Sequence, residues 1–382
     1  MKIVDIVTYP LKSDLARKMY YAEGEVDARR SLIVEVVTDC GISGWGESFC
    51  HGVQSPLLAQ KIIDVTLKPM LIGQSPFDAA VLWEKMYAAT QPYGRKGLVI
   101  SAISGIDIAL WDCLGRALEQ PIYKLMGGAY RKDVAPYASG FFRVDDGRYP
   151  EAYVEEARAY AADGYQGMKM KGGYGVNVDT KAVQAVREAI GDDIELMVDV
   201  NCAYNVAAAK RLLKRLEPYD VLWLEEPLPP DDLEGYLELK NFSSINIAGG
   251  ENEFSKIGFR QWIAQRAVDI LQPDLCYAGG FTECHKILAM AEAWHMTVMP
   301  HAWGSGVALA ASMNFMAIIP PAPSTFMPSE PLLEYDRSTH PFRQDLIYPN
   351  IELVDGRVPI PDGPGIGVEV NKEKLLYFAS KS

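Results

Sequence analysis

Cysteine is scarce in this sequence. Its six cysteines form no C-x-x-C pair and show no spacing typical of a disulfide framework, which is typical of a protein in a reduced compartment. We also expect no signal peptide, because residues 1–5 lead directly into a strand-like run, and no membrane span, because no apolar stretch approaches the roughly 18 residues that one needs. We therefore expect a cytoplasmic protein without a membrane partner.

Positive charge is in deficit. There are 37 Lys and Arg against 50 Asp and Glu, which gives a net charge of −13 and disfavours nucleic acid or an anionic membrane as the main partner. An anionic small substrate stays possible, because a buried metal and lysines can set the local field. Hydrophobic residues make up 49% and charged residues 23%, so we expect a large core rather than disorder.

A regular series of short apolar segments occupies the middle of the chain, and each segment ends in a charged residue. The ends are Lys171, Asp199, Glu225, Glu251, Asp274 and His301, at intervals of 23 to 28 residues (274 − 251 and 199 − 171). A strand, two short loops and a helix have about this length. The series predicts a (β/α) barrel with functional groups at its C-terminal rim. An ordinary parallel sheet with scattered charges is the alternative, but its buried strands would be continuously apolar.

The length of 382 residues suggests two domains, or one barrel with a substantial addition. We predict an α+β capping domain over residues 1–128, with an antiparallel strand meander followed by three apolar helices. Residues 129–335 are predicted to form a modified (β/α)7β TIM-type barrel, with eight strands and seven helices. Residues 336–382 have nowhere to go inside a closed barrel, so we expect them to return to the capping domain.

Two lysines lie at the end of the second predicted barrel strand. Lys169 and Lys171 are two residues apart, so both point into the barrel mouth. Like charges disfavour the protonated form and would lower each pKa, which would make a lysine a competent general base. The alternative is a pair of lysines on an exposed strand, which a lone K-x-K pattern also fits.

Three carboxylates follow on consecutive strand ends. Asp199, Glu225 and Glu251 are predicted to converge, and carboxylates at close range repel one another unless a cation holds them. An all-oxygen set suits Mg²⁺ or Mn²⁺. Alternation alone does not distinguish Glu225 from Glu226, but the equal spacing favours Glu225. A purely structural carboxylate cluster is the alternative.

His301 follows an apolar strand and is one of only five histidines. Asp274, at the preceding strand end, can hydrogen-bond one ring nitrogen and fix the tautomer, as orienting carboxylates do for catalytic histidines. The pair would form a second acid/base group opposite the lysines, whereas a lone histidine would more often be a satisfied core residue. Asp107 and Asp112, in the third predicted helix, are interpreted as structural.

Two loops of the N-terminal region are candidate substrate lids. One spans residues 17–24 and mixes charge with tyrosine, including Tyr20, and the other spans residues 50–52 and contains His51. A solvated hairpin loop is the alternative for either segment.

These residues resemble the mandelate racemase/muconate lactonizing enzyme branch of the enolase superfamily over essentially the whole chain. The motifs that carry the resemblance are AISGIDIALWDCLGR, LMGG, MVDVN, EEP, GGEN and GGFT. It implies that Asp199, Glu225 and Glu251 bind Mg²⁺, with Mn²⁺ possible. It also implies that Lys171, with Lys169 beside it, is one base, that His301–Asp274 is the other, and that Glu334 hydrogen-bonds the substrate carboxylate. The implied substrate-binding residues are Asn201, Trp303, Tyr20 and His51.

Within that family, the last third of the chain is similar to galactarolactone cycloisomerases, through DILQPDLCYAGGFTE, PHAWGSGV, EPLLEYDRSTHPFRQ and IPDGPGIGVEVN. The resemblance implies proton abstraction from an acid-sugar lactone, then β-elimination with ring opening to a keto-deoxy acid. Acid-sugar dehydration is the first alternative, and racemisation or epimerisation is the second. A catalytically silent sugar-acid binding protein would have lost a ligand or a base, and none is lost. We also expect a homo-oligomer.

Overall fold

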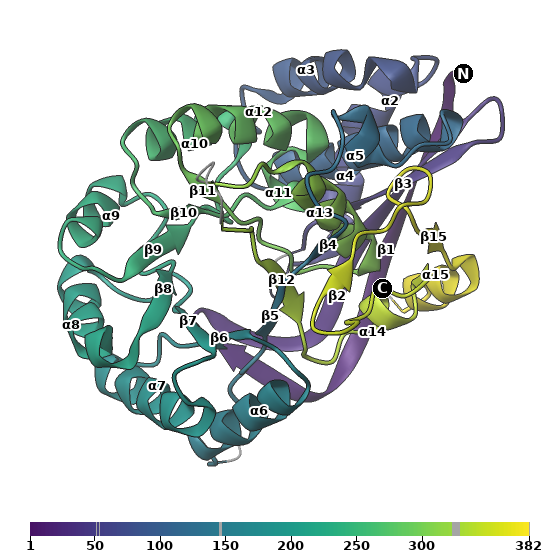
Figure 1. Cartoon of the computed structure of the whole chain (residues 1–382). Coiled ribbons are helices and arrows are strands. Elements are labelled where there is room, and N and C mark those ends of the chain that lie inside the picture. The colour runs from purple at the N-terminus through teal and green to yellow at the C-terminus, as the bar shows by residue number, and fades with distance from the viewer. Residues whose placement is uncertain (51, 53, 145–146, 323–328, 382) are drawn as a thin grey trace.

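The structure is a computed structural model of the whole chain, and it describes all residues except 51, 53, 145–146, 323–328 and 382. A curved sheet of parallel strands lies at the centre, with helices around its outer side (Figure 1). A separate region of antiparallel strands and helices, built from the N-terminal part, packs beside it. The predicted fold class is confirmed.

The N-terminal region begins with three antiparallel strands in the order β1-β2-β3. They are β1 (Ile3–Tyr21), β2 (Gly24–Thr38) and β3 (Ser43–Ser48). The predicted loop at residues 17–24 is wrong, because pairing between the first two strands continues to Tyr21 and Gly24. Met19 and Val26 pair across this hairpin and are both buried, so apolar burial holds the strands together beyond the register shift that follows Asp14.

Helices complete this region: α1 (Pro56–Ile62), η1 (Ile63–Leu67), α2 (Lys68–Leu71), η2 (Pro76–Asp78), α3 (Ala79–Thr90), α4 (Leu98–Ala117) and α5 (Ile122–Leu125). Helix α4 crosses the strands so closely that a side chain at Gly46 would come within 2.1 Å of the Gly105 carbonyl oxygen.

Among the described residues, α4 alone is long and apolar enough to cross a membrane, which corrects the expectation that no such stretch exists. However, 89% of its apolar window is buried inside the protein, as in the core helix of a globular fold.

The two acidic residues of α4 are structural, as predicted. Asp107 accepts a hydrogen bond from the Thr282 backbone N–H (2.9 Å). Asp112 accepts from the backbone N–H groups of Trp45 and Ile366 (2.8 Å each) and from Arg116 Nε (2.8 Å). Asp112 therefore ties together the N-terminal strands, α4 and the C-terminal segment.

We expect Asp112→Ala to destabilise the protein by about 3–5 kcal/mol, because the substitution leaves Arg116 Nε and two buried backbone N–H groups without their acceptor. The measurement is thermal unfolding followed by circular dichroism. Asp193→Ala, at an exposed position, is the matched control and should leave the midpoint unchanged. Equal midpoints for the two variants would contradict the structural role of Asp112.

The central sheet is parallel and has the order β11-β10-β9-β8-β7-β6-β5-β12. Its strands are β5 (Pro136–Ser139), β6 (Gly167–Lys171), β7 (Glu195–Asp199), β8 (Val221–Glu225), β9 (Asn246–Gly249), β10 (Ile270–Leu271), β11 (Thr297–Val298) and β12 (Leu333–Asp336). The last strand pairs with the first, as a barrel requires. Strands β10 and β11 are shorter than the apolar segments predict. Each is followed closely by a proline, Pro273 or Pro300, which cannot donate to a strand ladder.

Helices connect these strands: α6 (Glu151–Ala162), α7 (Val176–Ile190), α8 (Val206–Leu216), η3 (Glu217–Tyr219), α9 (Leu233–Lys240), α10 (Ser255–Ala264), α11 (Leu275–Ala278), α12 (Gly280–Ala293) and α13 (Gly306–Ile318). Because every strand runs in the same direction, the residues at the strand ends meet at one rim of the sheet.

The C-terminal segment contains α14 (Pro341–Gln344), β13 (Ile347–Tyr348), β14 (Val358–Pro359), β15 (Glu369–Val370) and α15 (Lys372–Ala379), and β14 pairs with β4 (Asp133–Val134). This segment contacts the N-terminal region. Arg116 pairs with Glu369 (2.7 Å), and Lys372 pairs with Glu35 on β2 (3.1 Å). In Figure 1, α15 accordingly lies beside the long hairpin of β1 and β2.

Candidate active site

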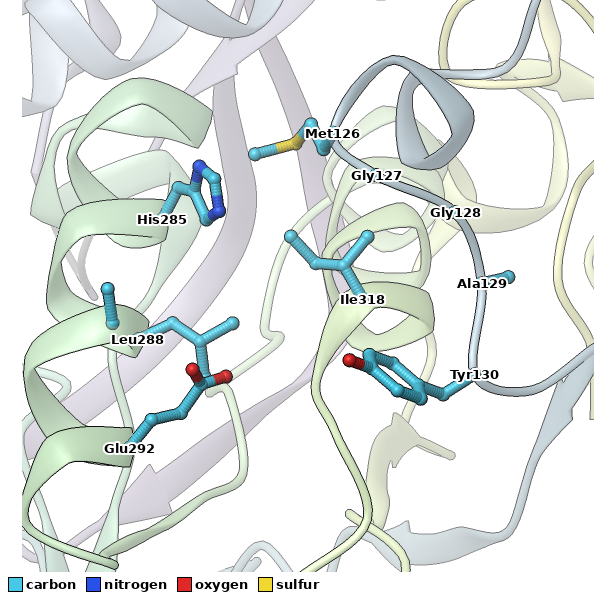
Figure 2. Close-up of a pocket in the computed structure, with 10 residues that line it drawn as sticks. Met126, Gly127, Gly128, Ala129, Tyr130, His285, Leu288, Glu292 and Ile318 are labelled. Atoms are coloured by element: carbon cyan, nitrogen blue, oxygen red, sulfur yellow. The ribbon is translucent and has the colours of Figure 1, made fainter.

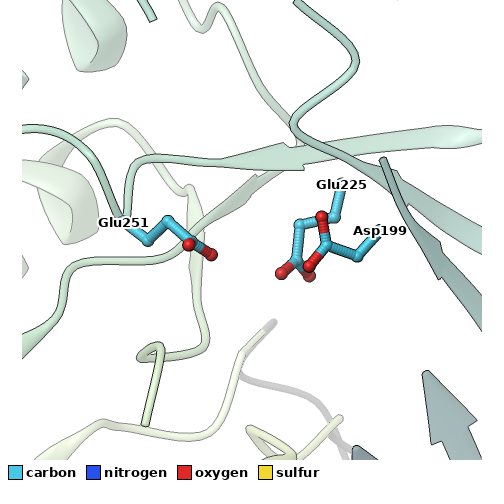
Figure 3. Close-up of side chains that lie close together, drawn as sticks. All are labelled: Asp199, Glu225 and Glu251. Atoms are coloured by element: carbon cyan, nitrogen blue, oxygen red, sulfur yellow. The ribbon is translucent and has the colours of Figure 1, made fainter. Parts of the chain in front are cut away.

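Three buried carboxylates converge at the C-terminal rim of the sheet (Figure 3). Asp199 ends β7, Glu225 ends β8, and Glu251 follows β9. One oxygen of each lies within 4.8 Å of the others. Glu225 belongs to the cluster, as the spacing predicts. The Glu226 carboxylate instead accepts a hydrogen bond from Asn252 Nδ2 (2.7 Å).

Neighbouring donors orient two of the three carboxylates. Glu225 accepts from Trp223 Nε1 (2.9 Å) and from Gln272 Nε2 (2.7 Å), and Asp199 accepts from the Asn201 backbone N–H (2.9 Å). Glu251 Oε2 is buried and has no hydrogen-bond partner among the residues that the structure describes. An all-oxygen donor set with an unpartnered carboxylate oxygen fits a hard divalent cation. These residues can therefore hold a metal ion.

The two lysines lie beside this cluster. Lys169 Nζ pairs with Glu225 and with Glu334 (2.8 Å), and Lys171 Nζ pairs with Asp199 (2.6 Å). We predicted that the two lysines lower each other's pKa, and this prediction is wrong for the protein without a bound cation or substrate. Burial lowers the pKa of each lysine, but attraction to the carboxylates outweighs it and raises both. Repulsion between the two ammonium groups is the weaker effect, because carboxylates surround both.

His301 and Asp274 form the predicted pair, with 2.6 Å between Nδ1 and Oδ2. The other oxygen of Asp274 accepts the Cys276 backbone N–H (2.7 Å), which fixes the carboxylate. His301 Nε2 lies 3.7 Å from Glu251 and 3.8 Å from Glu334. Burial alone would lower the His301 pKa, but attraction to Glu251 and Glu334 and the bond to Asp274 raise it to about 10.

Glu334, on β12, is the last of the predicted catalytic residues in the chain. It accepts hydrogen bonds from Ser139 Oγ (2.8 Å) and from the Ala302 backbone N–H (3.3 Å). Burial alone would raise its pKa, but attraction to Lys169 and His301 lowers it. The carboxylate is therefore ionised at neutral pH, and it links the lysine side of the site to the histidine side.

A cavity opens onto these groups. Its lining consists of Tyr21, Phe49, Gly52, Ser139, Phe142, Lys171, Asn201, Glu251, His301, Trp303 and Glu334. Lys171 and His301 stand on opposite sides of it, since four strands separate β6 from β11 in the sheet order. The cavity thus offers one acid/base group on each face of a bound molecule.

Of the predicted substrate-binding residues, Asn201 and Trp303 line the cavity. Tyr21 lines it in place of Tyr20, because neighbouring residues of a strand point to opposite faces. His51 lies outside the described residues.

Three residues that line the cavity were not predicted from the sequence: Phe49, Ser139 and Phe142. Ser139 was detectable, because it stands at the carboxyl end of the first barrel strand, where the other rim residues were sought. Phe49 and Phe142 carry no comparable signal, since aromatic residues are common in any core.

A larger cavity lies elsewhere, between α12 and the linker of residues 126–130. Figure 2 shows His285 and Glu292 on one wall and Tyr130 on the other. None of the predicted site residues that the structure describes lines this cavity, so we place the active site at the carboxylate cluster.

The end of the long hairpin is fixed over the barrel mouth. The backbone N–H groups of Tyr20 and Arg143 each donate to the other residue's carbonyl (2.8 and 3.0 Å), and Tyr174 Oη donates to the Tyr20 carbonyl (2.9 Å). Tyr21 then reaches the cavity. Although the segment is a strand hairpin rather than a loop, it occupies the place of a lid.

We expect replacement of residues 17–24 by the corresponding segment of a relative to change the substrate profile while metal affinity stays the same, because the hairpin contributes Tyr21 but no carboxylate of the cluster. The measurements are turnover across a panel of acid sugars and calorimetric Mg²⁺ binding. An unchanged profile would place specificity elsewhere.

Comparison with known proteins defines the class. Residues 5–127 match the mandelate racemase/muconate lactonizing enzyme N-terminal domain, and residues 152–374 match the enolase C-terminal domain-like family. The chain belongs to this family and is an enzyme of the enolase superfamily.

Particular relatives span nearly the whole chain. D-galactarolactone cycloisomerase of Agrobacterium fabrum (strain C58 / ATCC 33970) is 39% identical over 99% of both chains. Arabinonate dehydratase of Saccharolobus solfataricus is 32% identical over 92% of this chain and 91% of the relative. The crystal structure of 3,6-anhydro-D-galactonate cycloisomerase from Zobellia galactanivorans has a TM-score of 0.89 and 35% identity, with 99% of each chain covered.

Proposed function

We propose that the protein is a Mg²⁺-dependent cycloisomerase that opens a sugar-acid lactone by β-elimination to a keto-deoxy acid. The observation that carries the proposal is the cavity itself, in which Lys171 and His301 face each other across a cluster of three carboxylates. The similarity to D-galactarolactone cycloisomerase over 99% of the chain supports the choice of substrate class.

Asp199, Glu225 and Glu251 would hold the cation, with Mn²⁺ as a possible substitute for Mg²⁺. When bound, a divalent cation stabilises negative charge that develops on the substrate carboxylate, which is the main obstacle to removing a proton next to a carboxylate. Glu334, held by Ser139 and Ala302, would orient the substrate through a hydrogen bond.

The chain's own residues would move the protons. Lys171 would take the proton from the α-carbon, and the electron pair left behind would expel the ring oxygen from the β-carbon. His301 would supply a proton to the enolic product or to the departing oxygen, with Asp274 fixing its tautomer. Every atom of the lactone stays in the product, so the overall change is an isomerisation.

Dehydration of an open-chain acid sugar is the second candidate, and the similarity to arabinonate dehydratase favours it. Both reactions begin with the same proton abstraction. They differ in the leaving group, which is a ring oxygen in the lactone and a hydroxyl group in the open-chain acid.

The test is incubation with a panel of aldarolactones and acid sugars in D₂O with Mg²⁺, followed by proton NMR. We expect a lactone to be consumed with ring opening and deuterium incorporation. Loss of water from an open-chain acid would identify a dehydratase instead, and exchange without elimination would identify a racemase or epimerase. No exchange in any compound would overturn proton abstraction from this substrate class.

A further inference from the structure

The short segment of residues 301–305, which carries His301 and Trp303, is held by groups from distant parts of the chain. Arg343, in α14, lies behind it and is buried. Its Nη2 donates to the carbonyl oxygens of Ala302 (3.4 Å) and Gly304 (3.3 Å). These are the two carbonyls that flank Trp303, so Arg343 fixes the backbone from which that side chain projects.

A second buried arginine fixes the ring. Arg29, on β2, has a guanidinium carbon 4.9 Å from the centre of the Trp303 ring and 5.9 Å from that of Phe142. Both rings line the active-site cavity, and Arg29 does not. Arg29 therefore lies behind the aromatic wall, where its Nε donates to the Thr339 carbonyl (3.0 Å).

Asp336 balances part of this buried charge, with 3.6 Å between its Oδ2 and Arg29 Nη2. The carboxylate belongs to β12, the strand that also carries Glu334. The strand that positions Arg29 therefore also carries the predicted catalytic residue Glu334. The aromatic rings beside Arg29 and the catalytic carboxylate are thus held by one element.

The indole of Trp303 carries a donor that no protein group among the described residues accepts. Its Nε1 is buried and has no hydrogen-bond partner among the described residues. A buried donor left without an acceptor is costly, and this one belongs to a side chain that lines the cavity in which an oxygen-rich substrate would bind. A substrate oxygen would supply the missing acceptor.

We propose that Arg29 and Arg343 are positioning residues that clamp Trp303, so that its indole N–H donates a hydrogen bond to a hydroxyl or carboxylate oxygen of the substrate. The inference rests on the proposed function, because it requires an oxygen-bearing ligand in this cavity. It adds a specificity determinant in the capping region and another in the C-terminal segment, and neither touches the reacting atoms.

The contact with the Trp303 ring requires a planar cationic side chain at position 29. A guanidinium is planar and lies flat against an aromatic ring, whereas a lysine ammonium keeps the charge but not the flat contact. Arg29→Lys should therefore loosen the indole without removing the buried charge. Arg30→Lys is the matched control, because its guanidinium pairs with Asp27 (2.8 Å), outside the clamp.

The kinetic test uses the substrate found in the panel. We expect Trp303→Phe and Arg29→Lys each to raise KM by about tenfold, the effect of losing one hydrogen bond, with kcat within about twofold because ground-state binding is what is lost. The double variant should be no worse than either single variant. Additive losses, or a fall in kcat with KM unchanged, would overturn the clamp.

A second measurement needs no turnover. The protein has seven tryptophans, and labelling with 5-fluorotryptophan gives each a ¹⁹F resonance, with Trp303→Phe identifying that of Trp303. We expect this resonance to shift or broaden in Arg29→Lys and to stay in place in Arg30→Lys. An unchanged Trp303 resonance in Arg29→Lys would overturn the positioning role, even if the proposed reaction itself failed in the panel.

Discussion

Removal of divalent cations with EDTA is expected to abolish turnover, and Mg²⁺ or Mn²⁺ is expected to restore it. The reason lies in the cluster of Asp199, Glu225 and Glu251, whose oxygens lie within 4.8 Å of one another. Protein donors orient two of these carboxylates, but Glu251 Oε2 has no hydrogen-bond donor in the described part of the chain. Without a cation, the charge that develops on a substrate carboxylate would lose its main stabilisation.

Substitutions of the cluster should give the same result one residue at a time. Asp199→Asn, Glu225→Gln and Glu251→Gln should each lower kcat by about 10³-fold or more, in keeping with the several kcal/mol that a metal ion contributes to charge stabilisation. Calorimetric titration with Mg²⁺ should show weakened binding in all three.

Glu226→Gln is the matched control, because Glu226 is the adjacent buried carboxylate and is bonded to Asn252 outside the cluster. It should retain metal binding and most of the turnover. Full activity of any cluster variant after stringent chelation would remove that residue from the site.

The two acid/base groups are expected to separate in an exchange experiment. Lys171→Ala should abolish exchange of the α-proton in D₂O, whereas His301→Asn should preserve exchange but block product formation. Each group reaches one face of the α-carbon only, since four strands separate β6 from β11 in the sheet order. A positioned acid or base contributes about 10²–10⁴-fold to the rate of its step. The rate of exchange in Lys171→Ala and the rate of product formation in His301→Asn should therefore each fall by that factor.

Lys171 is chosen as the base although Asp199 raises its pKa. A divalent cation on Asp199 would oppose that attraction and favour the neutral amine. His295→Asn, at an exposed position, is the control and should leave both steps unchanged. If His301→Asn stopped exchange while Lys171→Ala retained it, the two roles would be reversed.

Much of the site was predictable from the sequence because it is built from a local pattern. Short apolar segments that end in Lys171, Asp199 or Glu225 define parallel strands, and the ends of parallel strands meet at one rim whatever the rest of the chain does. The same argument places Ser139 at the rim. It was not predicted because an uncharged serine at a strand end does not by itself indicate a functional site.

The hairpin was mispredicted because its polar and aromatic residues suggest a loop. Met19 and Val26 are paired and both buried, so the strands continue through this segment. The backbone hydrogen bonds between Tyr20 and Arg143, which join the hairpin to a distant part of the chain, are not visible in the sequence. The choice between Tyr20 and Tyr21 follows from the same pairing, because it sets which face of the strand looks into the cavity.

The sequence by itself determined the barrel, the carboxylate cluster and the pair of His301 and Asp274, since periodicity and residue type at strand ends are local properties. Only the tertiary structure decided the direction of the lysine pKa shifts and the clamping of Trp303 by Arg29. A pKa depends on every charge within a few ångströms, and the groups that surround Lys169 come from β8 and β12. Arg29 and Trp303 are far apart in the chain, and the folding of the N-terminal strands against the barrel alone brings them into contact.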